Sequence, residues 1–149
     1  MPQLSLHSPV GDLTVSAEDA HIVAVDWGWG RDQSETPLLC AARDQLDAYF
    51  DGQLHDFNLP LAPRGTSFDR QVWRAMQEIP YGCTQSYGDI AHRLHGIARA
   101  VGVACGRNPI PVIIPCHRVL AADSLGGYSG QGGVDTKAAL LRLEGALLA

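Results

Sequence analysis

Residues 86–106 read SYGDIAHRLHGIARAVGVACG, and this segment predicts two helices joined by a short turn. Ser86 can begin the first helix, because Asp89 follows three residues later as a capping-box partner. A turn follows at Gly96, and the second helix extends over residues 97 to roughly 106. Two helices separated by a short turn that contains glycine are the outline of a helix-turn-helix motif. We therefore expect the C-terminal half of the chain to be mostly helical.

The second of these helices is made almost entirely of small residues. Ala98, Ala100 and Gly102 leave a thin helix whose backbone can come close to a partner surface. Arg99 is the exception, a long cation among small neighbours, and it fits insertion into a duplex or a contact with phosphate. The alternative interpretation is a tightly packed internal helix, and the sequence leaves both open.

Further elements are expected on both sides of this motif. Upstream, a helix capped at Thr66 or Ser67 ends before Pro80. Downstream, the apolar residues 110–114 predict a buried strand. A closing helix then begins at Asp135 or at the next residue.

The N-terminal part of the chain has a different pattern. Short alternating runs at residues 4–6 and 13–15 predict a β-hairpin, which a strand over residues 21–27 continues. Apolar residues at helical spacing then predict a helix over residues 36–50. The segment 59–65 contains prolines and a glycine and is the best candidate for a linker.

We place a domain boundary in this linker, between a small α/β domain at residues 1–62 and a mostly α domain at residues 63–149. The first contains two basic and ten acidic residues, for a net charge of −8. The second contains nine basic and six acidic residues, for a net charge of +3, which together give the −5 of the whole chain. The basic residues of the second domain can face phosphate or can be ordinary solvated charges, and charge alone does not decide between them.

The composition of the 149 residues is that of a globular protein, with 46% hydrophobic and 18% charged residues. The first residues lack the basic and apolar regions of a signal peptide. No apolar run approaches the roughly 20 residues that a membrane helix needs. We therefore expect a cytoplasmic protein that does not bind membranes.

Cys116 and His117 follow an apolar run clamped by prolines, NPIPVIIPCHRV at residues 108–119. A thiol becomes a strong nucleophile as thiolate, and a neighbouring imidazole favours that form. Successive side chains of a straight strand point to opposite faces, so the chain must turn here or a water must bridge the two groups. A carboxylate usually orients such a base, and Glu144 and Asp123 are the candidates.

Seven short motifs occur in order along the C-terminal half of the chain. They are QVW at 71–73, IPYG at 79–82, SYGDIA at 86–91, RAVG at 99–102, NPIPVIIPCHRV at 108–119, GYSG at 127–130 and the tail K…LL…EG at 137–145. Together they resemble the catalytic domain of the O6-alkylguanine-DNA alkyltransferases, the methylated-DNA–protein-cysteine methyltransferase family. The N-terminal residues resemble the variable domain of this family only loosely.

The resemblance implies a ribonuclease H-like fold for the α/β domain and a winged-helix fold with a helix-turn-helix for the mostly α domain. It also implies a monomer without a cofactor, whose partner is double-stranded DNA that contains O6-alkylguanine. The damaged base is rotated out of the duplex, and Cys116 accepts its alkyl group once per molecule. Some family members carry zinc in the N-terminal domain. The candidate ligands here show no recognisable spacing, so we predict no metal; they are His7, His21, Cys40 and His55.

The resemblance also implies a role for each residue of the site. His117, through a water, takes the proton of the Cys116 thiol, and Glu144 orients the imidazole. Tyr87 helps to protonate the guanine leaving group. Arg99 fills the space that the base vacates, and Asn108 ties the helix-turn-helix to the active-site loop. The DNA-contacting helix of Arg99 also carries Ala98, Ala100 and Gly102. The residues that line the base pocket are Val119, Tyr128, Ser129 and Cys105.

Three segments depart from the pattern of the family. Residues 95–98 and 121–125 are short, and residues 131–133 are extra. These departures bear on substrate range and DNA affinity.

Two other functions are also considered. The first is a protein that senses alkylated bases without accepting the group, and the presence of Cys116 argues against it. The second is a Cys-His hydrolase or acyl transferase that acts on small molecules. The hydrolase would turn over and would show no salt-dependent binding to DNA.

Overall fold

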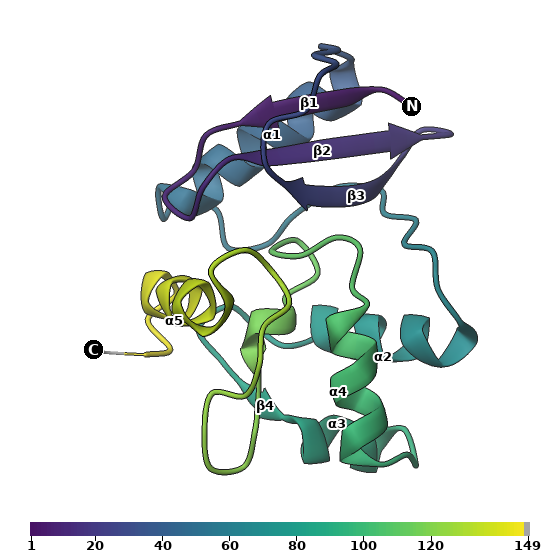
Figure 1. Ribbon diagram of the computed structural model, residues 1–149, viewed down its shortest axis with the longest axis vertical. Coiled ribbons are helices and arrows are strands. Elements are labelled where there is room, and N and C mark those ends of the chain that lie inside the picture. Colours follow the sequence, from purple (N-terminus) through teal and green to yellow (C-terminus); the bar gives the residue numbers. More distant parts are fainter. Residues whose placement is uncertain (148–149) are drawn as a thin grey trace. The chain divides into compact units, whose positions relative to one another are not determined.

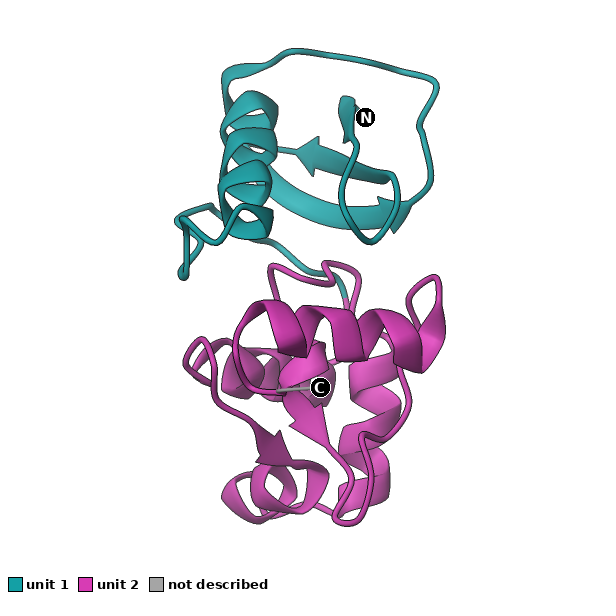
Figure 2. Ribbon diagram, turned by 90° about the vertical axis from the view of Figure 1, so that its left-hand side faces the viewer, with its two compact units in different colours: residues 1–64 teal, residues 65–149 magenta. Residues whose placement is uncertain are grey.

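The computed structural model describes residues 1–147, and the chain divides into two compact units (Figure 2). The first unit, Met1–Arg64, contains a sheet and one helix, and the second begins at Gly65 and is mainly helical. An N-terminal sheet domain followed by a C-terminal helical domain confirms the expected fold class at this level. Within residues 1–147, none of the helices combines the length and the apolar character required to cross a membrane.

The N-terminal unit is built on a three-stranded antiparallel sheet (Figure 1). Its strands β1 (Gln3–Leu6), β2 (Leu13–Glu18) and β3 (His21–Trp27) pair in sequence order, as the alternating runs predicted. Helix α1 (Pro37–Phe50) packs against the sheet and begins after Thr36, whose hydroxyl caps its first turn. The strands alternate in side-chain direction, so their apolar residues share one face and form a core with the helix.

Three helices form the centre of the C-terminal unit: α2 (Ser67–Gln77), α3 (Tyr87–Arg93) and α4 (Ala98–Gly106). The capping box predicted at the start of α3 is confirmed, because the N–H of Asp89 donates to the Ser86 hydroxyl and the N–H of Ser86 donates to the Asp89 carboxylate, both at 2.9 Å. Helix α4 packs against α2 and α3. The helix-turn-helix outline therefore corresponds to α3, a short turn and α4 (Figure 1).

A buried tryptophan holds α4 against α2. The indole Nε1 of Trp73 donates a hydrogen bond of 2.8 Å to the carbonyl of Ala104, and the side chain is only 1% exposed. Gly65 lies against this ring, because a Cβ at that position would be 2.4 Å from a ring carbon. Packing and a satisfied indole N–H together fix the position of α4 relative to α2.

The strand expected at residues 110–114 is absent, and the segment forms a buried turn. The N–H of Ile114 bonds to the carbonyl of Ile110 at 2.9 Å, and Val112 has a φ of 72°. Pro111 inside the segment and Pro109 and Pro115 beside it have no N–H, so they cannot complete the ladder that a strand requires. The segment is apolar because it is buried, and the prediction of a strand was wrong.

The remaining elements bring the end of the chain back to the centre of this unit. A 3-10 helix, Cys116–Arg118, leads into β5 (Val119–Leu120), which pairs in parallel with β4 (Gln85–Ser86). Helix α5 (Gly133–Leu143) packs against the 3-10 helix and begins two residues before the expected start at Asp135.

Candidate active site

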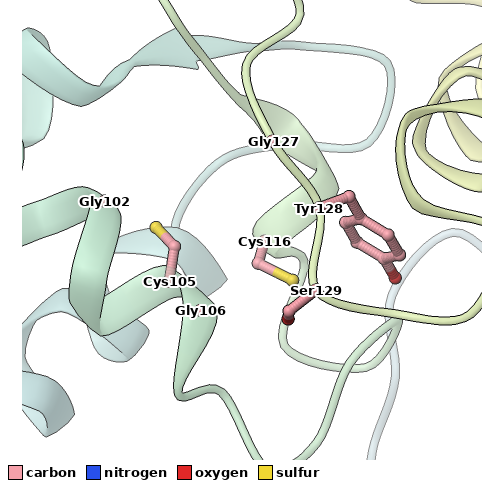
Figure 3. A pocket seen from close by; sticks show the side chains of 7 residues that line it. All are labelled: Gly102, Cys105, Gly106, Cys116, Gly127, Tyr128 and Ser129. Atoms are coloured by element: carbon pink, nitrogen blue, oxygen red, sulfur yellow. The ribbon is translucent and has the colours of Figure 1, made fainter.

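A pocket in the C-terminal unit has Cys116 in its wall (Figure 3). Its volume is about 180 Å³. One side is formed by α4 and the other by the segment that precedes α5 (Figure 3). The lining residues are Gly102, Cys105 and Gly106 from α4, Cys116 from the 3-10 helix, and Gly127, Tyr128 and Ser129.

The Asn108 side chain holds the chain that leads to Cys116. Its amide nitrogen donates to the carbonyl of Ile114 at 2.8 Å, and its oxygen accepts from the N–H of Ile110 at 2.9 Å. Its own N–H donates to the carbonyl of Cys105, at the end of α4, at 3.2 Å. Asn108 thus bridges α4 and the buried turn, which ends at the nucleophile candidate.

Cys116 is buried, with 6% of its surface exposed, and it is the better placed of the two pocket thiols. Burial raises its pKa, while the Asn108 side chain and the Lys137 ammonium act in the opposite direction. Burial and the charge of Cys116 raise the pKa of Cys105 to about 12. The Cys105 sulfur contacts the Met76 sulfur at 3.6 Å and points away from Cys116 (Figure 3). Cys116 is therefore the candidate nucleophile.

His117 forms a buried pair with Glu144. The imidazole Nε2 lies 2.7 Å from the carboxylate Oε2, and neither side chain is exposed. Because a carboxylate accepts, Nε2 carries the proton and Nδ1 presents a lone pair. Within residues 1–147 no group bonds to Nδ1. Burial lowers the pKa of His117, although Glu144 opposes this, so the imidazole is neutral and can accept a proton.

Arg118 is a member of this cluster that the sequence reasoning missed. Its Nε donates to Glu144 Oε1 at 2.8 Å and its Nη2 donates to Oε2 at 3.0 Å, while Nη1 donates to the carbonyl of Ile79 at 2.7 Å. The guanidinium is buried and lies 5.8 Å from the ring centre of Tyr81. The second carboxylate candidate, Asp123, is exposed. Glu144 is thus held on one side by Arg118 and on the other by His117.

Lys137 is the second residue that the sequence reasoning missed. Its side chain has no exposed surface, and its Nζ donates to the carbonyls of Val119 at 2.6 Å and Gly127 at 3.1 Å. Over the described residues no carboxylate forms an ion pair with it. Burial lowers its pKa, and the two pocket cysteines raise it. A buried ammonium whose described hydrogen bonds go to carbonyls is well placed to stabilise a thiolate.

These two positions correct the interpretation of charge. Arg118 and Lys137 were counted among the basic residues that can face phosphate, and both are buried. A lone cation next to an apolar run looks the same in sequence whether it is solvated or buried. The only signal available was position, because Arg118 lies directly after His117 and Lys137 lies on the helix that carries the closing leucines.

Tyr87, the first residue of α3, faces the segment that covers the pocket. Its hydroxyl lies so close to Gly126 that a Cβ there would be 2.9 Å away, and Gly126 has a φ of +75°. Lys137 Nζ lies 5.7 Å from the centre of its ring. Burial, followed by the two cysteines, raises its pKa, so the phenol stays protonated and can donate. Tyr128 also lines the pocket, but its ring points away from Cys116 (Figure 3).

Helix α4 carries the residues expected to contact DNA. Arg99 and Ala98 are exposed, and Ala100 and Gly102 are partly exposed. Arg99 forms no ion pair with any carboxylate of residues 1–147. The opposite side of α4 is buried, including Val101, so the helix presents its arginine and small residues outward.

Family models match both parts of the chain. The model described as 6-O-methylguanine DNA methyltransferase, DNA binding domain, matches residues 67–146. The model described as 6-O-methylguanine DNA methyltransferase, ribonuclease-like domain, matches residues 4–63. The chain belongs to the 6-O-methylguanine DNA methyltransferase family. The first of these matches contains every residue of the pocket and of the Cys116, His117 and Glu144 cluster.

Named relatives of this methyltransferase family cover nearly the whole chain. A methylated-DNA–protein-cysteine methyltransferase of Mycobacterium bovis is 54% identical, covering 94% of this chain and 90% of the relative. One from Methanosarcina acetivorans is 42% identical, covering 93% and 94%. The crystal structure of Mycobacterium tuberculosis OGT in complex with DNA superimposes with a TM-score of 0.88 at 41% identity, covering 98% of this chain and 94% of that chain.

Within the described residues, no group of three or more potential ligands is placed to hold a metal ion. That this methyltransferase family member works without a metal or a cofactor stays a prediction.

Proposed function

We propose that this chain repairs DNA by moving the alkyl group of O6-alkylguanine onto Cys116, once per molecule. The observation that carries the assignment is the pocket with a buried thiol next to a buried His117–Glu144 pair. Acceptor, base and orienting carboxylate therefore occur together in the part of the chain that the DNA binding domain model covers. The named relatives and the DNA complex of a similar structure support DNA as the partner.

The transfer is a displacement at the alkyl carbon. The Cys116 thiol gives its proton through a water to Nδ1 of His117, the ring atom without a partner in residues 1–147. The thiolate attacks the alkyl carbon, so that a sulfur–carbon bond forms and the carbon–O6 bond breaks. The electron pair of that bond stays on the guanine, which takes a proton through the Tyr87 hydroxyl. The products are an S-alkylcysteine and an intact guanine, and the thioether cannot be turned over.

Three charged residues prepare the site for this step. Glu144 fixes the tautomer and the orientation of His117, and Arg118 fixes Glu144 through two hydrogen bonds. Lys137 lowers the pKa of Cys116. Its hydrogen bonds to the carbonyls of Val119 and Gly127 also connect the segments that carry these two residues to α5. Arg118 and Lys137 are positioning and electrostatic residues in this scheme.

The base reaches the pocket by rotation out of the duplex, because its O6 substituent is hard to reach inside the stack. In this proposal α4 lies in the minor groove as the recognition helix of a winged-helix fold. Arg99 fills the space that the base leaves, and the small residues allow the backbone to approach the DNA; they are Ala98, Ala100 and Gly102. The base pocket is lined by Cys105, Val119, Tyr128 and Ser129, and Asn108 couples α4 to the active-site turn.

The remaining features of the proposal concern the protein as a whole. The domains at residues 1–62 and 63–149 have a ribonuclease H-like and a winged-helix fold. The protein is a monomer that requires no cofactor. A cytoplasmic location agrees with the four cysteines, none of which forms a disulfide.

Intact-protein mass spectrometry after incubation with an O6-methylguanine duplex tests the function. We expect one methyl group per molecule, mapped to Cys116, in the wild type and none in Cys116→Ala. Cys83→Ala, which removes an exposed cysteine, is the matched control and should react like the wild type. Tight binding to the lesion without a mass change would favour a sensor, and neither binding nor a mass change would favour a hydrolase of small molecules.

A further inference from the structure

Two cysteines line the pocket, and the proposed transfer uses only one of them as a nucleophile (Figure 3). Cys116 lies on the 3-10 helix and Cys105 lies on α4. Both are almost fully buried, with 6% of Cys116 and 7% of Cys105 exposed. Lining a base pocket does not require a second thiol. The sulfur of Cys105 is therefore a reactive group that the transfer leaves unused.

Asn108 and Lys137 connect the two cysteines. The N–H of Asn108 donates to the carbonyl of Cys105 at 3.2 Å, and its side chain hydrogen-bonds Cys116 and so lowers the pKa of that thiol. Burial raises the pKa of both thiols, the charge of Cys116 adds to this rise at Cys105, and Lys137 lowers both. The two sulfurs thus share one asparagine, one buried ammonium and one cavity.

A weak contact holds the Cys105 sulfur away from Cys116. It lies 3.6 Å from the Met76 sulfur, and a thioether accepts only weak hydrogen bonds (Figure 3). The nearby Gly102 and Gly106 have no side chains, and a Cβ at either position would meet no heavy atom within 4 Å outside its chain neighbours and helix backbone. Rotation about the Cα–Cβ bond of Cys105 can therefore turn its sulfur toward the pocket at little cost.

We propose that Cys105 is the resolving thiol of Cys116: when a peroxide oxidises Cys116, the two cysteines form a disulfide that thiols can reduce. The Cys116 sulfur attacks one oxygen of hydrogen peroxide, so that a sulfur–oxygen bond forms, the oxygen–oxygen bond breaks, and a sulfenic acid remains. The released hydroxide takes up the proton of the Cys116 thiol. The Cys105 sulfur then attacks the Cys116 sulfur, and the second hydroxide leaves with the Cys105 proton as water. The peroxide gains the two electrons that the thiols lose.

This step protects a residue that the proposed transfer can use only once. Oxidation of a cysteine beyond the sulfenic acid, to sulfinic or sulfonic acid, is not reversed by thiols. A disulfide stops the oxidation at a stage that thiol–disulfide exchange reverses. The inference goes beyond the proposed transfer and does not depend on it, because it requires only that the Cys116 sulfur is nucleophilic.

The competing explanation is that Cys105 is a small buried residue without redox chemistry. Peroxide would then convert Cys116 to sulfinic acid at the same rate with and without the Cys105 thiol. A resolving thiol instead competes with this second oxidation and diverts Cys116 into a disulfide.

The test treats the full chain with a small excess of hydrogen peroxide and maps its cysteines by mass spectrometry without reduction. Trypsin cleaves after arginine, so Cys105 and Cys116 fall in separate peptides, residues 100–107 and 108–118. In the wild type we expect these two peptides to be joined and the intact mass to be lower by two hydrogens. Cys83→Ala, which removes an exposed cysteine, is the matched control and should behave like the wild type.

Cys105→Ala should accumulate sulfinic acid at Cys116 in place of the disulfide. Cys105→Ser, which keeps the size of the side chain, is the second variant and should give the same result, and thermal unfolding confirms that each variant is folded. Dithiothreitol added after the peroxide should restore alkyl transfer in the wild type and about tenfold less of it in Cys105→Ala. Wild-type protein already methylated at Cys116 should form no disulfide.

Other outcomes overturn the inference. Sulfinic acid at Cys116 of the wild type, formed as fast as in Cys105→Ala and without joined peptides, would show that Cys105 does not resolve it. A disulfide from Cys116 to Cys83 or Cys40, or a Cys116 that does not react with peroxide, would refute the inference as well. A wild type that forms the Cys105–Cys116 disulfide but takes no methyl group from DNA supports the inference and refutes the proposed function.

Discussion

Replacing Arg118 by methionine should destabilise the C-terminal unit strongly. The guanidinium makes two hydrogen bonds to Glu144 and one to the carbonyl of Ile79, all of them buried. Its removal leaves the Glu144 carboxylate, whose side chain is 0% exposed, with only His117 and weaker partners. The carbonyl of Ile79 also loses its charged donor. Breaking a buried ion pair from one side costs about 3–5 kcal/mol. Since about 4–8 °C of Tm correspond to 1 kcal/mol in a domain of this size, the Tm should fall by at least about 12 °C.

The chain contains a matched control for this prediction. Arg93 pairs with Glu78 on the surface, where the two side chains are 44% and 56% exposed. Such an exposed pair contributes only about 0–1 kcal/mol, so Arg93→Met should lower the Tm by no more than about 8 °C. Urea denaturation followed by circular dichroism measures both variants. In addition, the double variant Arg118→Met/Glu144→Gln should lose less free energy of unfolding than the two single changes added together.

The result that refutes this reasoning is a similar cost for the two arginines. If Arg118→Met lost less than about 1 kcal/mol, as an exposed pair does, the buried carboxylate would not depend on Arg118. Arg118→Lys adds an intermediate case, because an ammonium can contact Glu144 but cannot supply the planar fork that also reaches Ile79. If Arg118→Met does not fold and Arg118→Lys folds with reduced stability, the result agrees with a large loss of free energy of unfolding.

Further predictions concern the thiol, the imidazole and the DNA contact. Lys137→Met should slow the transfer and move its pH–rate profile to higher pH, since Lys137 lowers the pKa of Cys116; an unmoved profile would remove it from thiol activation. Burial lowers the pKa of His117 below about 6.5, so the unfolded chain binds a proton that the folded chain excludes. The free energy of unfolding should therefore fall as the pH drops below about 6.5, and denaturation of His117→Asn should show a weaker fall. Arg99→Ala should slow repair in duplex DNA more than reaction with free O6-benzylguanine, and equal losses would contradict its insertion. The Kd for duplex DNA should rise steeply with salt in titrations, as phosphate contacts require.

Local chemistry made some elements predictable from sequence. The start of α3 depends on the Ser86–Asp89 capping box, which involves residues only three apart. The hairpin and third strand of the N-terminal sheet follow from alternation, which is also a property of neighbouring residues. By contrast, the two-residue pair β4–β5 is too short to produce a period, and the N-cap of α5 is Gly132, which has no side chain to cap the helix.

The errors occurred where several segments combine. Residues 110–114 are apolar because they are buried, and a short apolar run looks the same in a strand and in a buried turn. Cys116 and His117 were found because they are adjacent in a distinctive run. The contributions of Arg118 and Lys137 depend on carbonyls and a carboxylate that are distant in sequence. No pattern along the chain reveals which cation will be enclosed by such partners.

The hydrogen bond from Trp73 to Ala104 gives the protein an optical probe of its own. Trp73 is the one tryptophan of the C-terminal unit, because Trp27 and Trp29 belong to the sheet unit. The carbonyl that it contacts precedes Cys105, a wall residue of the pocket. In a chain with Trp27→Phe and Trp29→Phe, Trp73 is the single tryptophan. Its fluorescence emission would then report changes in the environment of α4 during the reaction. Alkylation could then be timed by stopped-flow fluorescence on unlabelled protein.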